Sequence, residues 1–215
     1  MHRTRIKICG LTRSEDVQFA VSRGADAIGF VFARSPRQVS VEEAARLAAG
    51  VPAGVLRVGL FLDQEQAEIE RVLARVPLDV LQFHGRETGA QCSVFALPWL
   101  KAVAMEDEYS LERAEGNYAG AMGLLLDSHQ AGQRGGSGRV FDWSLVRSAA
   151  KPLWLAGGLN AANVAEAIKT VQPYAVDVSS GVESAPGVKD SGKISEFIEA
   201  ARAADKLIAG SEINE

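Results

Sequence analysis

The sequence predicts an α/β fold in which strands and helices alternate to form a (β/α)8 TIM barrel with a single domain. Eight short apolar runs start at intervals of 20 to 29 residues along the 215-residue chain, and segments with helical periodicity separate them. Each run is apolar almost throughout, as expected of a parallel strand buried on both faces. An open doubly wound sheet also fits this alternation. Eight near-equal units favour the closed barrel, which leaves no edge strand unpaired.

The expected strands share a high content of Val, Ile, Leu and Phe, which are the residues that parallel strands favour. In chain order they are RIKICG (5–10), AIGFVF (27–32), LRVGLFL (56–62), DVLQFHG (79–85), WLKAVAM (99–105), GLLLD (123–127), PLWLAGG (152–158) and AVDVSSG (175–181). Eight units in this length leave no room for a linker or a second domain.

Polar residues that can cap a helix precede most of the segments between these strands. Thr12 with Glu15, and Ser40 with Glu43, have the spacing of a capping box. Further helix starts are expected at Asp63, Asp142, Asn160 and Ser191. Segment 86–98 has the least regular pattern. We expect the barrel to occupy residues 1–207 and residues 208–215 to form a flexible tail.

The composition excludes several classes of protein. Lys and Arg total 23 against 27 Asp and Glu, a net charge of −4, so no overall positive field attracts nucleic acid or an anionic membrane. The apolar runs are much shorter than the ~20 residues of a transmembrane helix, and the N-terminus lacks the apolar stretch of a signal peptide. The two cysteines have no metal-binding spacing. We therefore expect a cytoplasmic protein without a metal or another cofactor.

Strand 5–10 carries the first candidate site residue. In a barrel the chemistry lies at the C-terminal ends of the strands, and Cys9 is at such an end. Alternation along a strand places Lys7 and Cys9 on the same, inward face. A reactive thiolate and a small buried side chain are both compatible with Cys9, whereas Cys92 lies in a helix-period segment and is expected to be a packed residue. Asp177 also points inward on the neighbouring strand, so Lys7 and Asp177 are expected to form a buried ion pair.

Asp127 ends strand 123–127 directly after three leucines. Such neighbours remove water from a carboxylate and raise its pKa toward the range of a general acid. Asp127 could instead cap the next helix. The segment that follows, 128–143, is long and rich in glycine, which is typical of an active-site loop that closes over a ligand.

The last two strand ends predict a phosphate site. Barrel enzymes often bind phosphate after strands seven and eight, where glycines let backbone N–H groups approach the oxyanion. The candidate residues are Gly157, Gly158, Ser179, Ser180 and Gly181. Glycines also serve simply as turn residues, but two such ends on adjacent strands favour a binding site.

Two further polar residues follow strand ends. Arg37 lies in a loop that Pro36 stiffens, and an arginine fork held in a rigid loop suits a substrate carboxylate. It could also be a solvated surface residue, like its neighbour Arg34. His84 could act as a general base, although the sequence identifies no partner for it.

Six of these segments resemble the phosphoribosylanthranilate isomerase family of tryptophan biosynthesis, in order and over the whole chain. They are KICGLT, GFVFARSPRQV, LQFHG, LLLDSHQAGQRGGSGRVFDW, LAGGLNAANV and VDVSSGVESAPGVKD. Phe83 stands where the family usually has Leu, which is an apolar exchange. The chain starts at its first strand, so we expect the single-function form rather than a fusion enzyme.

The resemblance implies an Amadori rearrangement of N-(5-phosphoribosyl)anthranilate to 1-(2-carboxyphenylamino)-1-deoxyribulose 5-phosphate, without a cofactor. It implies Asp127 as general acid, Cys9 as general base, Arg37 as the partner of the anthranilate carboxylate, and the late strand ends as the phosphate site. The related histidine-pathway isomerase would have Asp in place of Cys9, and a non-catalytic barrel would not need the Cys9 and Asp127 pair. A monomer and a homodimer are both compatible with the sequence.

Overall fold

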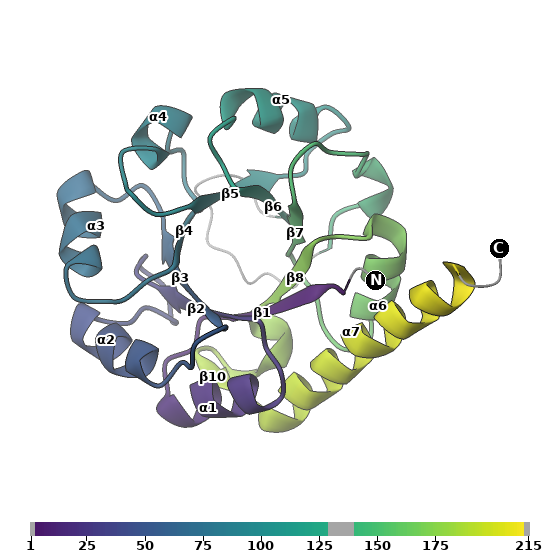
Figure 1. The fold of residues 1–215 in the computed structure, drawn as a ribbon, viewed down its shortest axis with the longest axis horizontal. Helices are drawn as coiled ribbons and strands as arrows, with labels where there is room; N and C mark the ends of the chain where they lie inside the picture. The colour runs from purple at the N-terminus through teal and green to yellow at the C-terminus, as the bar shows by residue number, and fades with distance from the viewer. Residues whose placement is uncertain (1–2, 129–139, 213–215) are drawn as a thin grey trace.

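The computed structural model describes residues 3–128 and 140–212, and in it eight parallel strands close into a barrel (Figure 1). The strands are β1 (Arg5–Cys9), β2 (Ala27–Val31), β3 (Leu56–Phe61), β4 (Val80–Phe83), β5 (Trp99–Ala104), β6 (Gly123–Asp127), β7 (Leu153–Leu155) and β8 (Ala175–Val178). Each strand pairs with the next, and β8 pairs with β1. The predicted TIM barrel is therefore confirmed.

The helices form the outer ring of the barrel (Figure 1). They are α1 (Ser14–Ser22), α2 (Val41–Ala49), α3 (Gln66–Leu73), α4 (Gly89–Cys92), α5 (Ser110–Asn117), α6 (Val164–Val171) and α7 (Ser191–Glu212), with 3-10 turns η1 (Trp143–Leu145) and η2 (Ser180–Val182). After η2, β9 (Glu183–Ala185) and β10 (Val188–Lys189) form a small antiparallel hairpin. None of the described helices is long and apolar enough to cross a membrane.

Side chains that alternate along the strands divide the core in two. One apolar cluster contains Val58, Leu100, Leu125 and Trp154 from four different strands, which fill the barrel interior. A larger cluster lies between the barrel and the helices and includes Ile28 and Phe197. This packing holds the strand ends rigidly at one face of the barrel.

Two of the expected helix starts illustrate how tertiary contacts modify a local signal. Ser40 and Glu43 form the predicted capping box at the start of α2. The prediction for Thr12 and Glu15 is wrong, because α1 begins without a side-chain cap and the Thr12 hydroxyl instead donates to the Gly187 carbonyl at 2.7 Å. A distant hairpin therefore takes the group that the sequence assigned to the helix.

The predicted starts at Asp63 and Asn160 are each too early. Asp63 has a φ of 52°, and α3 begins only after Glu65. Asn160 caps a turn by accepting from the N–H of Ala162 at 2.9 Å, and α6 begins after Asn163. Both residues belong to loops at the barrel face rather than to the helices.

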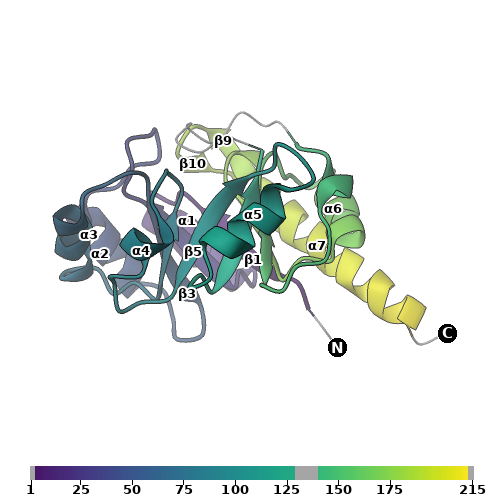
Figure 2. The same cartoon turned by 90° about the horizontal axis from the view of Figure 1, so that it is seen from above.

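The structure also differs from the sequence prediction near the ends of two segments. Asp142 does accept a hydrogen bond from the N–H of Ser144, but among the described residues after it only the short turn η1 forms before β7. Helix α7 continues through Glu212, past the barrel end predicted at 207 (Figure 2). Within this extension, Ile208 packs against the core. This contact explains why the helix extends into the predicted tail. Residues 213–215 of that tail lie outside the described residues.

Candidate active site

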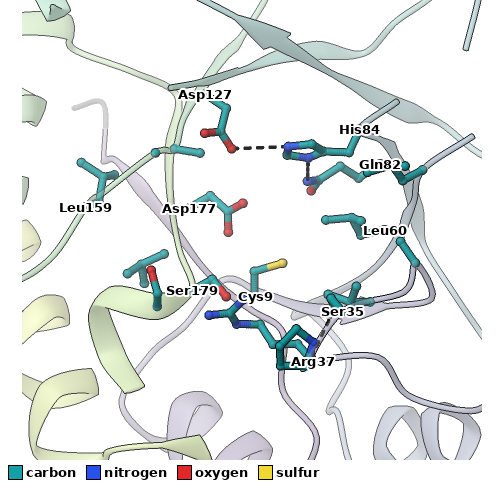
Figure 3. Close-up of a pocket in the computed structure, with 18 of the residues that line it drawn as sticks. Cys9, Ser35, Arg37, Leu60, Gln82, His84, Asp127, Leu159, Asp177 and Ser179 are labelled. Carbon is teal, nitrogen blue, oxygen red and sulfur yellow. Dashed lines mark hydrogen bonds and ion pairs between the residues drawn. The ribbon is translucent and has the colours of Figure 1, made fainter. Parts of the chain in front are cut away.

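A pocket opens at the C-terminal face of the barrel, between the ends of the strands (Figure 3). A concave site with a few convergent polar groups is typical of a small-molecule binding site. Nine of the residues selected from the sequence line it, namely Cys9, Arg37, His84, Asp127, Gly157, Gly158, Asp177, Ser179 and Ser180. Residues that were selected because they follow different strands therefore lie together at one site in the folded barrel.

Cys9 and the buried pair below it form one side of the pocket. Lys7 is 0% exposed, and its ammonium donates to Asp177 Oδ2 at 2.8 Å, which is the ion pair predicted from the sequence. Lys7 lies beneath the pocket and is not part of its wall, whereas Cys9 and Asp177 are. The thiol packs against Gly29 on β2. A side chain at that position would clash with it, since a Cβ there would lie 2.7 Å from Cys9 Sγ.

The charges around Cys9 act in opposite directions. Burial raises the pKa of the Cys9 thiol above its ordinary value, while the Lys7 ammonium favours the thiolate and the Asp177 carboxylate disfavours it. Burial alone would lower the pKa of Lys7, but Asp177 and Cys9 hold it above its ordinary value. The Lys7 ammonium is therefore stabilised as a cation next to a thiol whose pKa burial raises.

Asp127 and His84 lie across the cavity from Cys9 and Arg37 (Figure 3). His84 Nε2 is 3.5 Å from Asp127 Oδ2, and the Gln82 amide nitrogen is 3.4 Å from His84 Nδ1. The structure thus supplies the partner that the sequence did not identify for His84. An amide N–H beside Nδ1 makes that atom the acceptor and leaves the ring proton on Nε2, facing Asp127.

Gln82 is a site residue that the sequence analysis missed. It is 1% exposed, lines the pocket, and its carbonyl oxygen Oε1 has no hydrogen-bond partner among the described residues. A buried acceptor without a partner is costly unless a ligand satisfies it. A polar residue within the otherwise apolar run DVLQFHG was the available signal.

The glycine-rich ends of β7 and β8 form another part of the pocket wall. Gly157 and Gly158 have φ values of 81° and 69°, which glycine adopts without strain. A Cβ at Gly157 would lie 2.7 Å from the Ser128 nitrogen and 3.0 Å from Asp127 Oδ1. Close approach of the two loops to each other therefore requires glycine at this position.

Ser179, Ser180 and Gly181 continue this wall only in part. Ser179 and Ser180 line the pocket, whereas Gly181 does not. A Cβ at Gly181 would lie 1.9 Å from the Leu159 carbonyl oxygen, so this glycine packs the end of β8 against the loop after β7. The structure gives Gly181 a packing role, and its predicted part in phosphate binding stays a prediction.

Arg37 is held by a residue that the sequence analysis did not select. Its Nε and Nη2 atoms each donate to Glu183 at 2.7 Å, and these hydrogen bonds raise the pKa of Arg37. Lys189 also contacts Glu183, at 2.8 Å from Nζ to Oε1. Both residues lie in the segment VDVSSGVESAPGVKD that carries part of the family resemblance, but the sequence analysis assigned neither of them a role.

Two expectations concern groups that take no part in this pocket. Cys92 is the buried last residue of α4, and burial raises the pKa of its thiol to about 12, in keeping with a packed residue. Within residues 3–128 and 140–212, no cluster of His, Cys, Asp or Glu could hold a metal ion. Most of the predicted closing loop 128–143, namely 129–139, lies outside the described residues.

The fold and the site together define a (β/α)8-barrel enzyme with a polar pocket at the C-terminal ends of its strands. The sequence profile of N-(5'-phosphoribosyl)anthranilate (PRA) isomerase matches residues 6–200, which is most of the chain. The chain therefore belongs to the phosphoribosylanthranilate isomerase family of tryptophan biosynthesis, and it is an isomerase.

Individual relatives agree with this assignment. The N-(5'-phosphoribosyl)anthranilate isomerase of Pseudomonas putida strain W619 is 52% identical over 206 residues, which cover 95% of this chain and all of the relative. The phosphoribosyl anthranilate isomerase structure from Thermotoga maritima has a TM-score of 0.86 at 42% identity and covers 93% of this chain and 99% of its own. A further such structure, in complex with reduced 1-(o-carboxyphenylamino)-1-deoxyribulose 5-phosphate, has a TM-score of 0.81 at 41% identity, with the same coverage.

Proposed function

We propose that this isomerase converts N-(5-phosphoribosyl)anthranilate to 1-(2-carboxyphenylamino)-1-deoxyribulose 5-phosphate by an Amadori rearrangement, with Asp127 as general acid and Cys9 as general base. The observation that carries the proposal is that these two groups enter one pocket from β6 and β1, on opposite sides (Figure 3). A related isomerase structure holds a reduced form of the same product, which supports the choice of substrate.

The reaction begins at the ribose ring oxygen. Asp127 donates a proton to this oxygen, the bond from it to C1 breaks, and the anthranilate nitrogen supplies the electron pair that forms the iminium. The carboxylate of Asp127 that results is next to His84. With its proton on Nε2, His84 can donate to that carboxylate and stabilise it.

Cys9 acts in the second step. Its thiolate removes the proton from C2, and the electron pair of that bond forms the C1–C2 double bond of the enolamine while the iminium nitrogen is neutralised. The enolamine then becomes the ketone as C1 gains a proton and the 2-hydroxyl loses one. Lys7 favours the thiolate, so it helps the base to form inside a site whose burial opposes it.

The two ends of the substrate match two local groups of donors. We assign the anthranilate carboxylate to Arg37, whose Nη1 group has no hydrogen bond to the described residues. We assign the phosphate to the wall that Gly157, Gly158, Ser179 and Ser180 line, because backbone N–H groups and hydroxyls of such residues are the usual donors to an oxyanion. These local donors explain how a protein with a net charge of −4 can bind a ligand that carries both a carboxylate and a phosphate.

The proposal also covers the cellular compartment, the cofactor requirement and the assembly of the enzyme. We place the enzyme in the cytoplasm, because both described cysteines are free thiols, a state that a reducing compartment maintains. The chemistry needs no cofactor, since the acid, the base and the anion-binding groups are all side chains or backbone of the chain. A homodimer is compatible with the description of the Thermotoga maritima enzyme as dimeric, and a monomer remains compatible with this chain.

The direct test is turnover of freshly generated phosphoribosylanthranilate by the purified protein, with the aminoimidazole substrate of the related histidine-pathway isomerase as a second arm. We expect turnover of the first substrate. Turnover of the aminoimidazole alone would assign the protein to the other reaction. Binding of the product without turnover of either substrate would indicate a non-catalytic barrel and would contradict the proposal.

The phosphate assignment has its own test. Inorganic phosphate should raise the melting temperature by mass action in the wild type. Replacement of Gly158 by leucine should remove that increase while the barrel still folds, because a side chain on this pocket-lining glycine takes the space of the anion. An equal increase in both proteins would place the phosphate elsewhere.

A further inference from the structure

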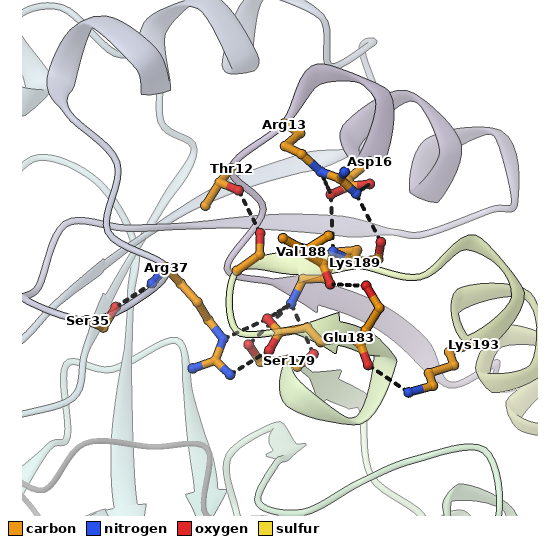
Figure 4. Close-up of polar contacts among 12 residues, drawn as sticks. Thr12, Arg13, Asp16, Ser35, Arg37, Ser179, Glu183, Val188, Lys189 and Lys193 are labelled. Carbon is orange, nitrogen blue, oxygen red and sulfur yellow. Dashed lines mark hydrogen bonds and ion pairs between the residues drawn. The ribbon is translucent and has the colours of Figure 1, made fainter.

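The hairpin of β9 and β10 carries two buried charges toward the pocket from outside the barrel (Figure 4). The Glu183 side chain is 5% exposed and that of Lys189 is 0% exposed. Charged side chains are buried this deeply only when they are paired, and such pairing often serves specificity rather than stability. Their contacts therefore indicate what this pair does.

Glu183 holds the arginine that is assigned to the substrate carboxylate. Arg37 donates to both Glu183 oxygens at 2.7 Å, in the two-bond geometry that fixes a guanidinium plane. Because Nε and Nη2 are occupied in this way, the Nη1 side of Arg37 is what remains for a ligand. Glu183 thus fixes the direction from which a carboxylate can approach.

Lys189 links the same carboxylate to the opposite end of the site. Its ammonium donates to Glu183 Oε1 at 2.8 Å, to the Ser179 carbonyl at 3.0 Å and to the Ser179 hydroxyl at 3.4 Å. Ser179 belongs to the wall assigned to the phosphate. Ion pairs from Arg37 through Glu183 to Lys189, and hydrogen bonds from Lys189 to Ser179, therefore connect the carboxylate end of the site with its phosphate end.

Other contacts keep the hairpin itself in place. Lys193 on α7 donates to the Glu183 carbonyl at 2.7 Å, and Arg13 donates to the Lys189 carbonyl at 3.0 Å (Figure 4). Thr12 donates to the Gly187 carbonyl in the turn of the hairpin. Gly187 also lies against the loop before Arg37, because a Cβ there would be 2.8 Å from the Pro36 carbonyl oxygen. The hairpin is thus tied to three elements around the pocket.

The sign of the charge on Glu183 shows that simple attraction does not explain its presence. A carboxylate beside a site for two anionic groups repels the ligand, so by charge alone Glu183 weakens binding. We propose that Glu183 and Lys189 are positioning residues that set the geometry of Arg37 and of the Ser179 loop together, and so align the carboxylate end and the phosphate end of the site. This inference rests on the ligand assignments of the proposed function.

The test uses two fragments and one variant, Glu183→Gln. NMR titration measures the affinity of anthranilate and of inorganic phosphate separately, and Glu199→Gln, whose exposed partner is Arg23, is the matched control. A neutral amide removes a repelling charge, so electrostatics alone predicts equal or tighter binding of both anions. Positioning predicts the opposite sign, with both affinities at least about fivefold weaker, as expected when charged hydrogen bonds are lost.

A second variant covers the case in which Glu183→Gln does not fold. Glu183→Asp keeps the charge but is one methylene shorter, so it cannot reach Arg37 and Lys189 together. Positioning predicts that both fragments bind more weakly to it, whereas Arg37→Ala should weaken anthranilate only. Unchanged or tighter binding of either fragment by the folded Glu183 variants would overturn the inference.

The outcomes separate this inference from the proposed function. Fragment affinities are measured without turnover, so they decide the positioning role by themselves. Turnover by the wild type with unchanged fragment binding in the Glu183 variants would leave the function intact and remove the inference. Absence of wild-type turnover, together with weaker binding of both fragments by the Glu183 variants, would contradict the proposed function and support the positioning role.

Discussion

Two buried lysine–carboxylate pairs in this barrel resemble each other in distance and differ in completeness. Lys7 contacts Asp177 at 2.8 Å between β1 and β8, and Lys101 contacts Glu87 at 2.9 Å near the ends of β5 and β4. In the first pair, Asp177 Oδ1 has no hydrogen-bond partner among the described residues. In the second, both oxygens of Glu87 are satisfied.

Backbone N–H groups complete the hydrogen bonds of the Lys101–Glu87 pair. Glu87 Oε1 accepts from the N–H of Asp63 at 2.8 Å, and Oε2 accepts from that of Gly85 at 2.9 Å. Lys101 also donates to the Gly85 carbonyl at 2.5 Å. The pair ties two loops together and has no capacity left for a ligand.

The difference shows how burial can serve either the fold or the chemistry. An ion pair whose hydrogen bonds are all used stabilises one arrangement of loops. In the Lys7–Asp177 pair, Asp177 lines the pocket and keeps one oxygen without a partner among the described residues, and both charges shift the pKa of Cys9. Loss of either lysine should reduce stability, because each leaves a buried carboxylate unpaired, but only loss of Lys7 should also change the chemistry.

The largest effect in free energy is expected for Lys101→Met. This change leaves Glu87 buried without its cation, which typically costs about 3–5 kcal/mol of unfolding free energy. Urea unfolding measures the loss, with the exposed Lys206→Met as control. The KM of the folded fraction should be unchanged. A stable variant with altered KM would contradict the distinction between the two pairs.

Asp127→Asn should have the next largest effect. The variant keeps the shape of the side chain but has no acidic proton to donate, so kcat should fall by ~10² or more. Product affinity should survive. The exposed Asp107→Asn is the matched control, and near-normal turnover by a verified Asp127→Asn preparation would exclude the general-acid role.

Arg37→Ala should act mainly on substrate binding. The contact with the carboxylate exists in the ground state and in the transition state alike, so KM should rise by about tenfold, the value of a charged hydrogen bond, while kcat changes little. Arg71→Ala, which removes an exposed arginine on α3, is the control and should leave KM unchanged. A fall in kcat at constant KM would assign Arg37 another role.

The smallest effect concerns the pH profile of Lys7→Met. The Cys9 base is active as thiolate, and burial raises its pKa, so kcat/KM of the wild type should keep rising with pH beyond the usual range of a cysteine. Lys7 lowers that pKa. Its loss should therefore move the rising limb to higher pH. A rising limb at the same pH as in the wild type would mean that Lys7 does not affect the pKa of Cys9.

The sequence predicted the fold because the signals for it are local. Apolar runs, helical periodicity and chain length define eight units, and closure of the barrel then brings distant strand ends to one face. For this reason Cys9, Asp127 and the glycines of β7 could be selected before any contact was known. The Lys7–Asp177 pair followed from strand alternation and the adjacency of the first and last strands.

The missed residues depend on contacts that no local pattern records. Glu183 and Lys189 come together only because a short hairpin folds back toward β2, and Thr12 leaves its predicted cap for the same hairpin. Gln82 interrupts an apolar run, but its role follows only from the contact of its amide with His84. Such residues are identified by what surrounds them and not by their place in the chain.

The measurement that tests the central claim most directly is turnover of freshly generated substrate by Cys9→Ser. Serine preserves the size of the side chain, but its hydroxyl does not ionise in the range where a thiol does, so no base forms at C2. We predict a loss in kcat of ~10² or more with affinity for the product retained. Full activity in the folded variant would leave Cys9 as a packed residue of β1 and would contradict the account of the site.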